Sequence, residues 1–149
     1  MQGLSQSVGV EKPKALVFSE FAEACKLLHK EFPNSLMIIG ATPQEEREKI
    51  LKEFRENPDR QILFASKALE MGVNLQCVSL VVHYDPPLTY SSYDQRCSRA
   101  RRQGRADKVI SVRITVKGTV EDRIWKLIEA KRLISLASMP YNEWKELLN

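Results

Sequence analysis

The chain has 149 residues, of which 43% are hydrophobic and 28% charged, and its formal net charge is +4. This composition indicates one soluble globular domain with a mildly basic balance, which permits a nucleic-acid partner without requiring one. No apolar run is long enough to span a membrane, and the first residues lack the apolar stretch of a signal peptide, so no membrane partner is expected.

Short apolar runs alternate with segments of helical periodicity along the chain. In chain order, the expected elements are a strand over 15–18, a helix over 21–32, a strand over 36–39, a helix from Pro43 to about residue 56, strands over 61–65 and 79–83, an arginine-rich helix ending near Gly104, a strand over 109–116 and a helix from about Thr119 to Ser135. Thr42 and Thr119 stand where N-caps are expected. Trp144 and the leucines after it suggest a short terminal helix.

The alternation of strands and helices predicts the fold class. Short connections between such elements favour an α/β fold, with a mainly parallel sheet of about five or six strands and helices on both faces. In folds of this kind ligands bind at the carboxyl ends of the strands. The loops that follow the predicted strands should therefore carry the functional residues.

The segment from Gln95 to Arg105, QRCSRARRQGR, holds five arginines and no acidic residue. Gln95, Arg99 and Arg102 stand at i, i+4 and i+7, so on a helix they form one stripe. Planar, permanently charged donors on one stripe suit a polyphosphate. The alternative is a solvated surface or structural ion pairs. The remaining arginines are open to solvent or to nucleic-acid phosphates: Arg96, Arg101 and Arg105.

Several other reactive side chains are assigned structural roles. His29 and His83 lack a carboxylate or cysteine at ligand spacing, so they are interpreted as core or surface histidines and no metal site is predicted. Asp85 is interpreted as part of a rigid Asp-Pro-Pro turn. Packing is expected of Tyr84, Tyr90 and Tyr93. The three cysteines indicate a reducing compartment, with Cys25 and Cys77 as small buried side chains.

Six segments of the chain carry a resemblance. They are KALVFSEF (14–21), GATPQEEREKILKEF (40–54), ILFASKALEMGVNLQ (62–76), VVHYDPP (81–87), QRCSRARR (95–102) and GTVEDRI (118–124). In order and spacing they resemble motifs IV, V and VI, with their neighbours, of the second RecA-like lobe of superfamily two helicases and translocases. The Swi/Snf-type branch is the most similar. The resemblance implies a RecA-like three-layer sandwich over 14–135, a flexible lead-in over 1–13 and a helical extension over 136–149.

The resemblance also implies roles for individual residues. Arg102 is expected to be an arginine finger, with Arg99 as its companion at the γ-phosphate. The expected nucleotide-binding residues are Gln95, Gly72 and Asn74. The expected nucleic-acid-binding residues are Ser19, Gly40, Thr42, Arg47, Ser66 and Lys67. Structural alternatives remain open for some of them: a helix cap for Ser19, Thr42 and Ser66, and an ion pair with a nearby glutamate for Arg47.

A few positions differ from the Swi/Snf-type pattern. Ser98 and Arg105 stand where that branch has glycine and glutamine, and Leu69-Glu70 where it often has two glycines. Leu88 replaces an aromatic residue. A DEAD-box-like or antiviral-sensor-like second lobe is therefore an alternative within the same superfamily.

The sequence contains neither a G-x-x-x-x-G-K-[ST] phosphate loop nor a D-E-x-[DH] box. We therefore expect ATP and Mg²⁺ to be bound mainly by a first lobe, in the same or another chain, and the isolated chain to be inactive as an ATPase. The other expected partner is nucleic acid, with DNA favoured over RNA, and the isolated chain is expected to be monomeric. We expect an intracellular protein, cytoplasmic in a prokaryote and nuclear in a eukaryote. The alternative is a stand-alone nucleic-acid-binding or protein-interaction module.

Overall fold

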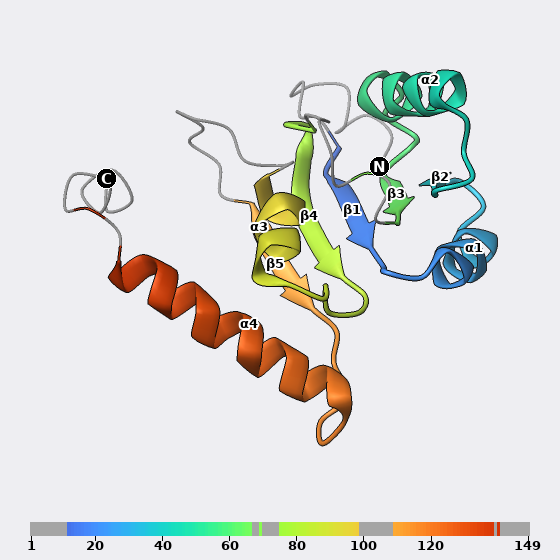
Figure 1. Ribbon diagram of the computed structural model, residues 1–149. Coiled ribbons are helices and arrows are strands. Elements are labelled where there is room, and N and C mark those ends of the chain that lie inside the picture. Colours follow the sequence, from blue (N-terminus) through green and yellow to red (C-terminus); the bar gives the residue numbers. More distant parts are fainter. Residues whose placement is uncertain (1–11, 67–68, 70–74, 99–108, 139, 141–149) are drawn as a thin grey trace.

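The computed structural model describes residues 12–66, 69, 75–98, 109–138 and 140 (Figure 1). The described elements, in chain order, are β1 (Lys14–Phe18), α1 (Ala22–Glu31), β2 (Leu36–Ile38), α2 (Gln44–Glu56), β3 (Ile62–Ala65), β4 (Val78–His83), α3 (Tyr90–Ser98), β5 (Ile110–Arg113) and α4 (Val120–Ala137). Each lies where the periodicity predicts it. The predicted terminal helix and the end of the arginine-rich helix lie outside the described residues.

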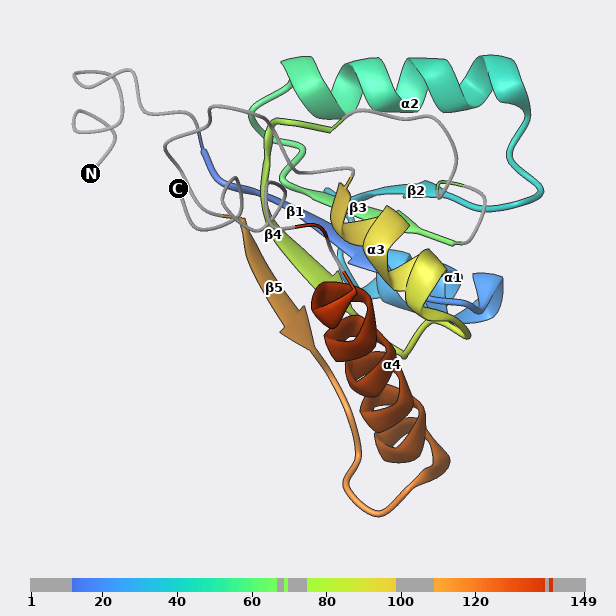
Figure 2. The same ribbon diagram turned by 60° about the vertical axis from the view of Figure 1, so that its left-hand side comes forward.

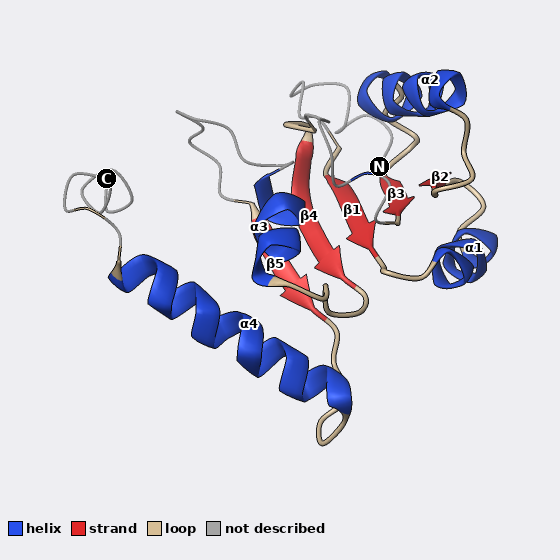
Figure 3. Ribbon diagram, in the orientation of Figure 1, coloured by secondary structure: helices blue, strands red, loops and turns tan. Residues whose placement is uncertain are grey.

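The five strands form one parallel sheet in the order β2-β3-β1-β4-β5 (Figure 3). β1 is central, and it is bonded to β3 on one side and β4 on the other. This arrangement confirms the predicted parallel α/β sheet. Parallel strands all end at the same edge, so the loops after β1, β2, β3 and β4 meet there.

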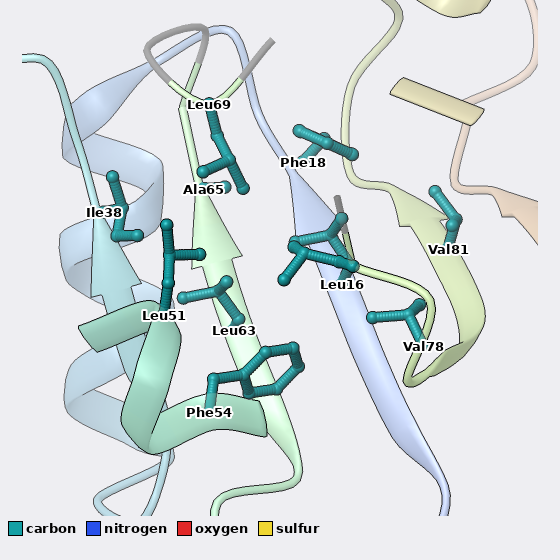
Figure 4. Close-up of a cluster of buried hydrophobic side chains, with 11 residues drawn as sticks. Leu16, Phe18, Ile38, Leu51, Phe54, Leu63, Ala65, Leu69, Val78 and Val81 are labelled. Carbon is teal, nitrogen blue, oxygen red and sulfur yellow. The ribbon is translucent and has the colours of Figure 1, made fainter. Parts of the chain in front are cut away.

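Helices cover both faces of the sheet, as Figure 2 shows for α1 and α2. Strand pairing aligns Leu16 with Leu63 and Val81, and these side chains pack beneath α2 residues Leu51 and Phe54 (Figure 4). On the other face Cys25 of α1 packs with the buried Ile39 and Phe64. The predicted three layers are therefore present. Full burial of one such aromatic or aliphatic side chain contributes about 1.5–3 kcal/mol.

The caps of two helices differ from their predictions. The N-cap of α2 is Pro43, and the Thr42 hydroxyl instead accepts a hydrogen bond from the Ile39 backbone N–H at 3.1 Å. Thr119 does occupy the N-cap of α4, but its hydroxyl donates to the Val116 carbonyl at 2.6 Å. In both cases a backbone group of the preceding loop engages the hydroxyl.

The last strand and helix differ from the predicted bounds because of their neighbours. β5 ends at Arg113, which pairs with His83, the last residue of β4. Beyond that point the Ile114 N–H still donates to the His83 carbonyl, at 2.9 Å. α4 runs two residues past the predicted Ser135, to Ala137, and projects beyond the sheet (Figure 1). Among the described residues, no helix is both long and apolar enough to cross a membrane.

Candidate nucleic-acid and nucleotide interface

Backbone hydrogen bonds hold the loops at the carboxyl edge of the sheet in a fixed order. The Ser66 N–H donates to the Ile38 carbonyl at 3.0 Å, and the Ser19 N–H donates to the Ala65 carbonyl at 3.1 Å. The Tyr84 N–H continues the series to the Phe18 carbonyl at 2.9 Å. The loops that carry the predicted residues Ser19 and Ser66 therefore lie side by side.

The loop from Ile39 to Thr42 is held by Arg47 of α2. Its Nε donates to the Thr42 carbonyl at 2.8 Å, and its Nη2 donates to the Gly40 carbonyl at 3.0 Å. This fork replaces the ion pair with a glutamate that was one alternative for Arg47. Gly40 is exposed, and no atom lies within 4 Å of the position that a Cβ would take there. The loop thus presents open backbone to solvent on a rigid support.

Ser19 is buried, and its hydroxyl has two protein partners. The hydroxyl donates to the carboxylate of Asp85 and accepts from the Phe21 N–H at 3.1 Å. It therefore orders the turn that leads into α1, whose N-cap residue Phe21 makes no side-chain cap of its own. The phosphate contact predicted for Ser19 stays a prediction. Ser66 is also buried, and its carbonyl accepts a hydrogen bond from the Leu69 N–H at 3.0 Å.

Arg96 is the clearest correction to the sequence predictions. The sequence analysis leaves it to solvent or to nucleic-acid phosphates, but its side chain is fully buried. Its guanidinium pairs with Glu20 at 2.8 Å, donates to the Asp85 carbonyl at 3.1 Å and lies 5.4 Å from the centre of the Phe18 ring. The missed signal is spacing: Tyr93, Arg96 and Cys97 stand at i, i+3 and i+4, on one face of α3, and this face packs on the sheet.

Asp85 joins the same buried group. Its carboxylate accepts from the Ser19 hydroxyl and from the Glu20 N–H, the latter at 2.7 Å. The chain bends at Asp85, and both prolines after it are buried, so the predicted turn is confirmed. What the sequence did not predict is that this turn is bonded to the loop after β1.

His83 is a core histidine, one of the two roles predicted for it. Its ring lies 5.1 Å from that of Tyr93 and 5.5 Å from that of Trp125, and its Nε2 is 3.1 Å from the Ser111 hydroxyl. Burial, followed by the positive charges of Arg96 and Arg113, lowers the pKa of His83 to about 3. The ring is therefore neutral near neutral pH. Among the described residues no group of three or more potential ligands could hold a metal ion.

The other packing predictions are met by some residues and not by others. Tyr90 contacts the ring of Tyr93, whereas Tyr84 is exposed. Cys25 is buried and burial raises its pKa to about 11, while Cys77 is only half-buried.

The nucleotide-directed residues are only partly described. Gln95 is exposed on α3, next in sequence to the buried Arg96. Five predicted site residues lie outside the described residues: Lys67, Gly72, Asn74, Arg99 and Arg102. A cavity of about 220 Å³ is lined by Phe32, Ser35, Gln61 and others near the amino ends of β2 and β3, and it shares no residue with the predicted site.

Comparisons with known proteins agree with this architecture. Residues 4–104 match the family described as the helicase conserved C-terminal domain. The SNF2 domain-containing protein ENL1 of Oryza sativa subsp. japonica is 32% identical over 132 residues, which cover 85% of this chain and 13% of that protein. The DNA repair protein rad8 of Schizosaccharomyces pombe is 32% identical over 130 residues, which cover 84% of this chain and 12% of that protein. The chain thus spans only a small part of the relatives that it matches.

A solved structure gives the same result in three dimensions. The C-terminal part of the Fun30 ATPase domain superposes with a TM-score of 0.72 at 27% identity, over 85% of this chain and 43% of that one. The five-stranded parallel sheet with helices on both faces is therefore RecA-like, as predicted. Because the family match covers more than half of its length, the chain belongs to the helicase conserved C-terminal domain family, the second RecA-like lobe of superfamily two helicases, and it is most similar to the Swi/Snf-type branch.

Proposed function

We propose that the chain is the C-terminal motor lobe of an ATP-dependent nucleic-acid helicase or translocase, and that it is inactive as an ATPase without a first lobe. In this proposal Arg102 is the arginine finger and Arg99 its companion at the γ-phosphate. Guanidinium groups there stabilise the charge that spreads over the transferring phosphoryl group. Residues 14–135 form the motor lobe, with a lead-in before it and a helical extension after it.

The observation that carries the proposal is the bonded series of loops at the carboxyl edge of the sheet. Backbone bonds set Ser19 and Ser66 side by side there, and the Gly40 loop follows the adjacent strand β2. We assign the nucleic-acid backbone to this edge, with Ser19, Gly40, Thr42, Arg47, Ser66 and Lys67 as the residues that form the binding edge. Arg47 acts by holding the Gly40 loop open toward a phosphate, because its own donors already bind that loop.

The described residues fit a nucleotide only in part. Gln95 offers an exposed amide on α3, which suits a contact to a nucleotide bound mainly by another lobe. Gly72 and Asn74 are assigned to the same nucleotide. Bound ATP with Mg²⁺ supplies the phosphoryl group whose transfer drives the motor. The residues of this chain orient that group and stabilise its charge, but they do not cradle it.

Because another lobe binds most of the nucleotide, the proposed function requires two partners. One is an N-terminal RecA-like lobe in the same or another chain. The other is nucleic acid, with DNA favoured over RNA, and the similarity to Swi/Snf-type proteins supports this preference. We propose an intracellular protein that is monomeric when the lobe is isolated.

The test is to join the chain to a first lobe that carries a phosphate loop and an acidic box, and to measure nucleic-acid-stimulated ATP hydrolysis. We expect no turnover by the isolated chain and stimulated turnover by the joined protein. Arg102→Ala should lower the stimulated rate by roughly 10³-fold or more, because the arginine acts on transition-state charge. Arg105→Ala, which removes an arginine outside the stripe, is the matched control and should keep most of the rate.

Turnover by the isolated chain that Arg102→Ala abolishes would contradict the proposal. A joined protein that binds nucleic acid but never hydrolyses ATP would favour the stand-alone binding module. The rate of ATP hydrolysis is then measured with duplex DNA and with RNA of equal length, and the higher rate identifies the preferred nucleic acid.

A further inference from the structure

Arg96 connects three segments that are distant in sequence. It lies on α3, its Nη2 binds the Glu20 carboxylate at 2.8 Å, and its Nη1 binds the Asp85 carbonyl at 3.1 Å. Glu20 follows β1 and Asp85 follows β4. The guanidinium therefore ties α3 to the ends of the two central strands.

The carboxylate of Asp85 closes this connection into a ring of contacts. It accepts from the Ser19 hydroxyl and from the Glu20 N–H, while Glu20 itself pairs with Arg96. The exposed fractions of the paired side chains are 0% for Arg96 and 9% for Glu20. A displacement of the Ser19–Glu20 turn cannot leave α3 unchanged, because the shared contacts are buried and directional.

Stability alone does not account for such a pair. Burying a guanidinium and a carboxylate costs several kcal/mol per ion, and apolar residues of similar volume often give equal or greater stability. The planar fork of an arginine, by contrast, has a fixed geometry, so two bonds from it set the rotation of a helix about its axis. On α3 that rotation determines where Gln95, one position away, is directed.

We propose that Arg96 is a positioning residue that couples the nucleic-acid edge to the nucleotide-directed stripe, through Glu20 and Asp85. Nucleic acid held at the Ser19–Glu20 turn shifts the two groups that bind Arg96, the Glu20 carboxylate and the Asp85 backbone carbonyl. Arg96 then sets the orientation of α3. This inference rests on the proposed function, because the stripe that α3 begins with Gln95 is the one assigned to the nucleotide. Arg96 touches neither ligand.

The test uses the protein assembled with its first lobe and compares Arg96→Met with the wild type. Methionine fills much of the same volume without the charge. We expect the stimulated kcat to fall by about tenfold or more, because misplaced catalytic groups cost rate steeply. The KM for ATP and the Kd for nucleic acid should stay near wild-type values, since a purely structural defect would change them as well. Arg60→Met, which removes an arginine paired with Glu53 at 2.9 Å near the amino end of β3, is the control and should change none of the three.

If Arg96→Met does not fold, Glu20→Gln is the variant that tests the same inference. It keeps an acceptor for Arg96 but removes the charge, so we expect a smaller loss of stimulation, and Arg96→Lys should not restore the wild-type value. Full stimulation in Arg96→Met, or in Glu20→Gln where only that variant folds, overturns the inference while the proposed function stands. A wild-type assembly without nucleic-acid-stimulated hydrolysis overturns the proposed function itself.

Discussion

Charged and titratable side chains in this domain differ mainly in what surrounds them. Arg47 is half-buried and binds backbone carbonyls, Arg96 is buried and binds a carboxylate, and His83 is buried among aromatic rings. The same residue type thus supports a loop in one place and orients a helix in another. The partners of Arg47 lie in the preceding loop, whereas those of Arg96 and His83 include segments distant in sequence, which local spacing does not identify.

The buried His83 leads to a prediction about acid stability. Its folded pKa of about 3 lies below its ordinary value of 6.5, so the unfolded state binds more protons between these two values. Stability therefore falls as the pH decreases through this window, by on the order of 3 kcal/mol between pH 7 and pH 4 from this group alone. Urea unfolding at several pH values should show a shallower decline for His83→Gln than for the wild type.

Tyr93→Phe is the control for that measurement, since it alters the same aromatic cluster without removing the imidazole. Equal pH slopes in His83→Gln and the wild type would show that the histidine does not titrate as its surroundings imply.

At the scale of single elements, α4 is attached to the body through its first half. Trp125 and Ile128 are buried, whereas Leu133 and Ile134 further along are exposed. The guanidinium of Arg113 lies 4.7 Å from the centre of the Trp125 ring and pairs with Glu129 at 3.2 Å. Among the described residues, the second half of the helix extends past the sheet (Figure 1).

We expect Trp125→Ala to release α4 from the sheet. Removing a buried aromatic side chain of this size costs about 3–5 kcal/mol, and here the lost contacts are with β4, α3 and Arg113. Hydrogen exchange should accelerate throughout Val120–Ala137 while the protection of β1 and β3 changes much less. Leu127→Ala, at a side chain that is 64% exposed, should change stability by no more than about 0.5 kcal/mol. Uniform loss of protection across the sheet would mean that α4 is part of one cooperative unit instead.

At the scale of the whole molecule, the two faces of the sheet are unequally covered. One face of β5 bears Ser111 and Arg113. On this face Arg113 donates hydrogen bonds to Tyr93 of α3 and to Glu129 of α4. The opposite face carries Ile110 and Val112, which are 61% and 40% exposed, so an apolar strip remains open among the described residues. An open apolar strip along an edge strand favours self-association.

Ile110→Lys should therefore raise the solubility of the isolated chain, with little change in the free energy of unfolding. Light scattering across a concentration series measures the effect. Thr115→Lys adds the same charge outside the strip, and it should improve solubility less. Equal gains from both substitutions would attribute the effect to net charge and not to the apolar strip.

Local patterns were sufficient for most of the fold. Short apolar runs located all five strands, because most strands of a parallel sheet are covered on both faces. Helical spacing located α1, α2 and α4, because each helix buries one face. The order of the motifs predicts the second RecA-like lobe. In that fold the loops that carry Ser19, Gly40 and Ser66 lie at one edge of the sheet. The errors within this part are small, such as the cap of α2 at Pro43 instead of Thr42.

The partners of the polar side chains required the tertiary structure. The spacing of Tyr93, Arg96 and Cys97 hints that Arg96 faces the sheet, but it does not identify the partner, because Glu20 stands 76 positions earlier and is brought near only when β1 and β4 pair. The same pairing sets Asp85 against Ser19, and the stacking of α4 on β4 makes His83 a neutral core residue. Local sequence determines which elements form, since that depends on near neighbours, whereas the packing of those elements decides which charges are buried and with what they pair.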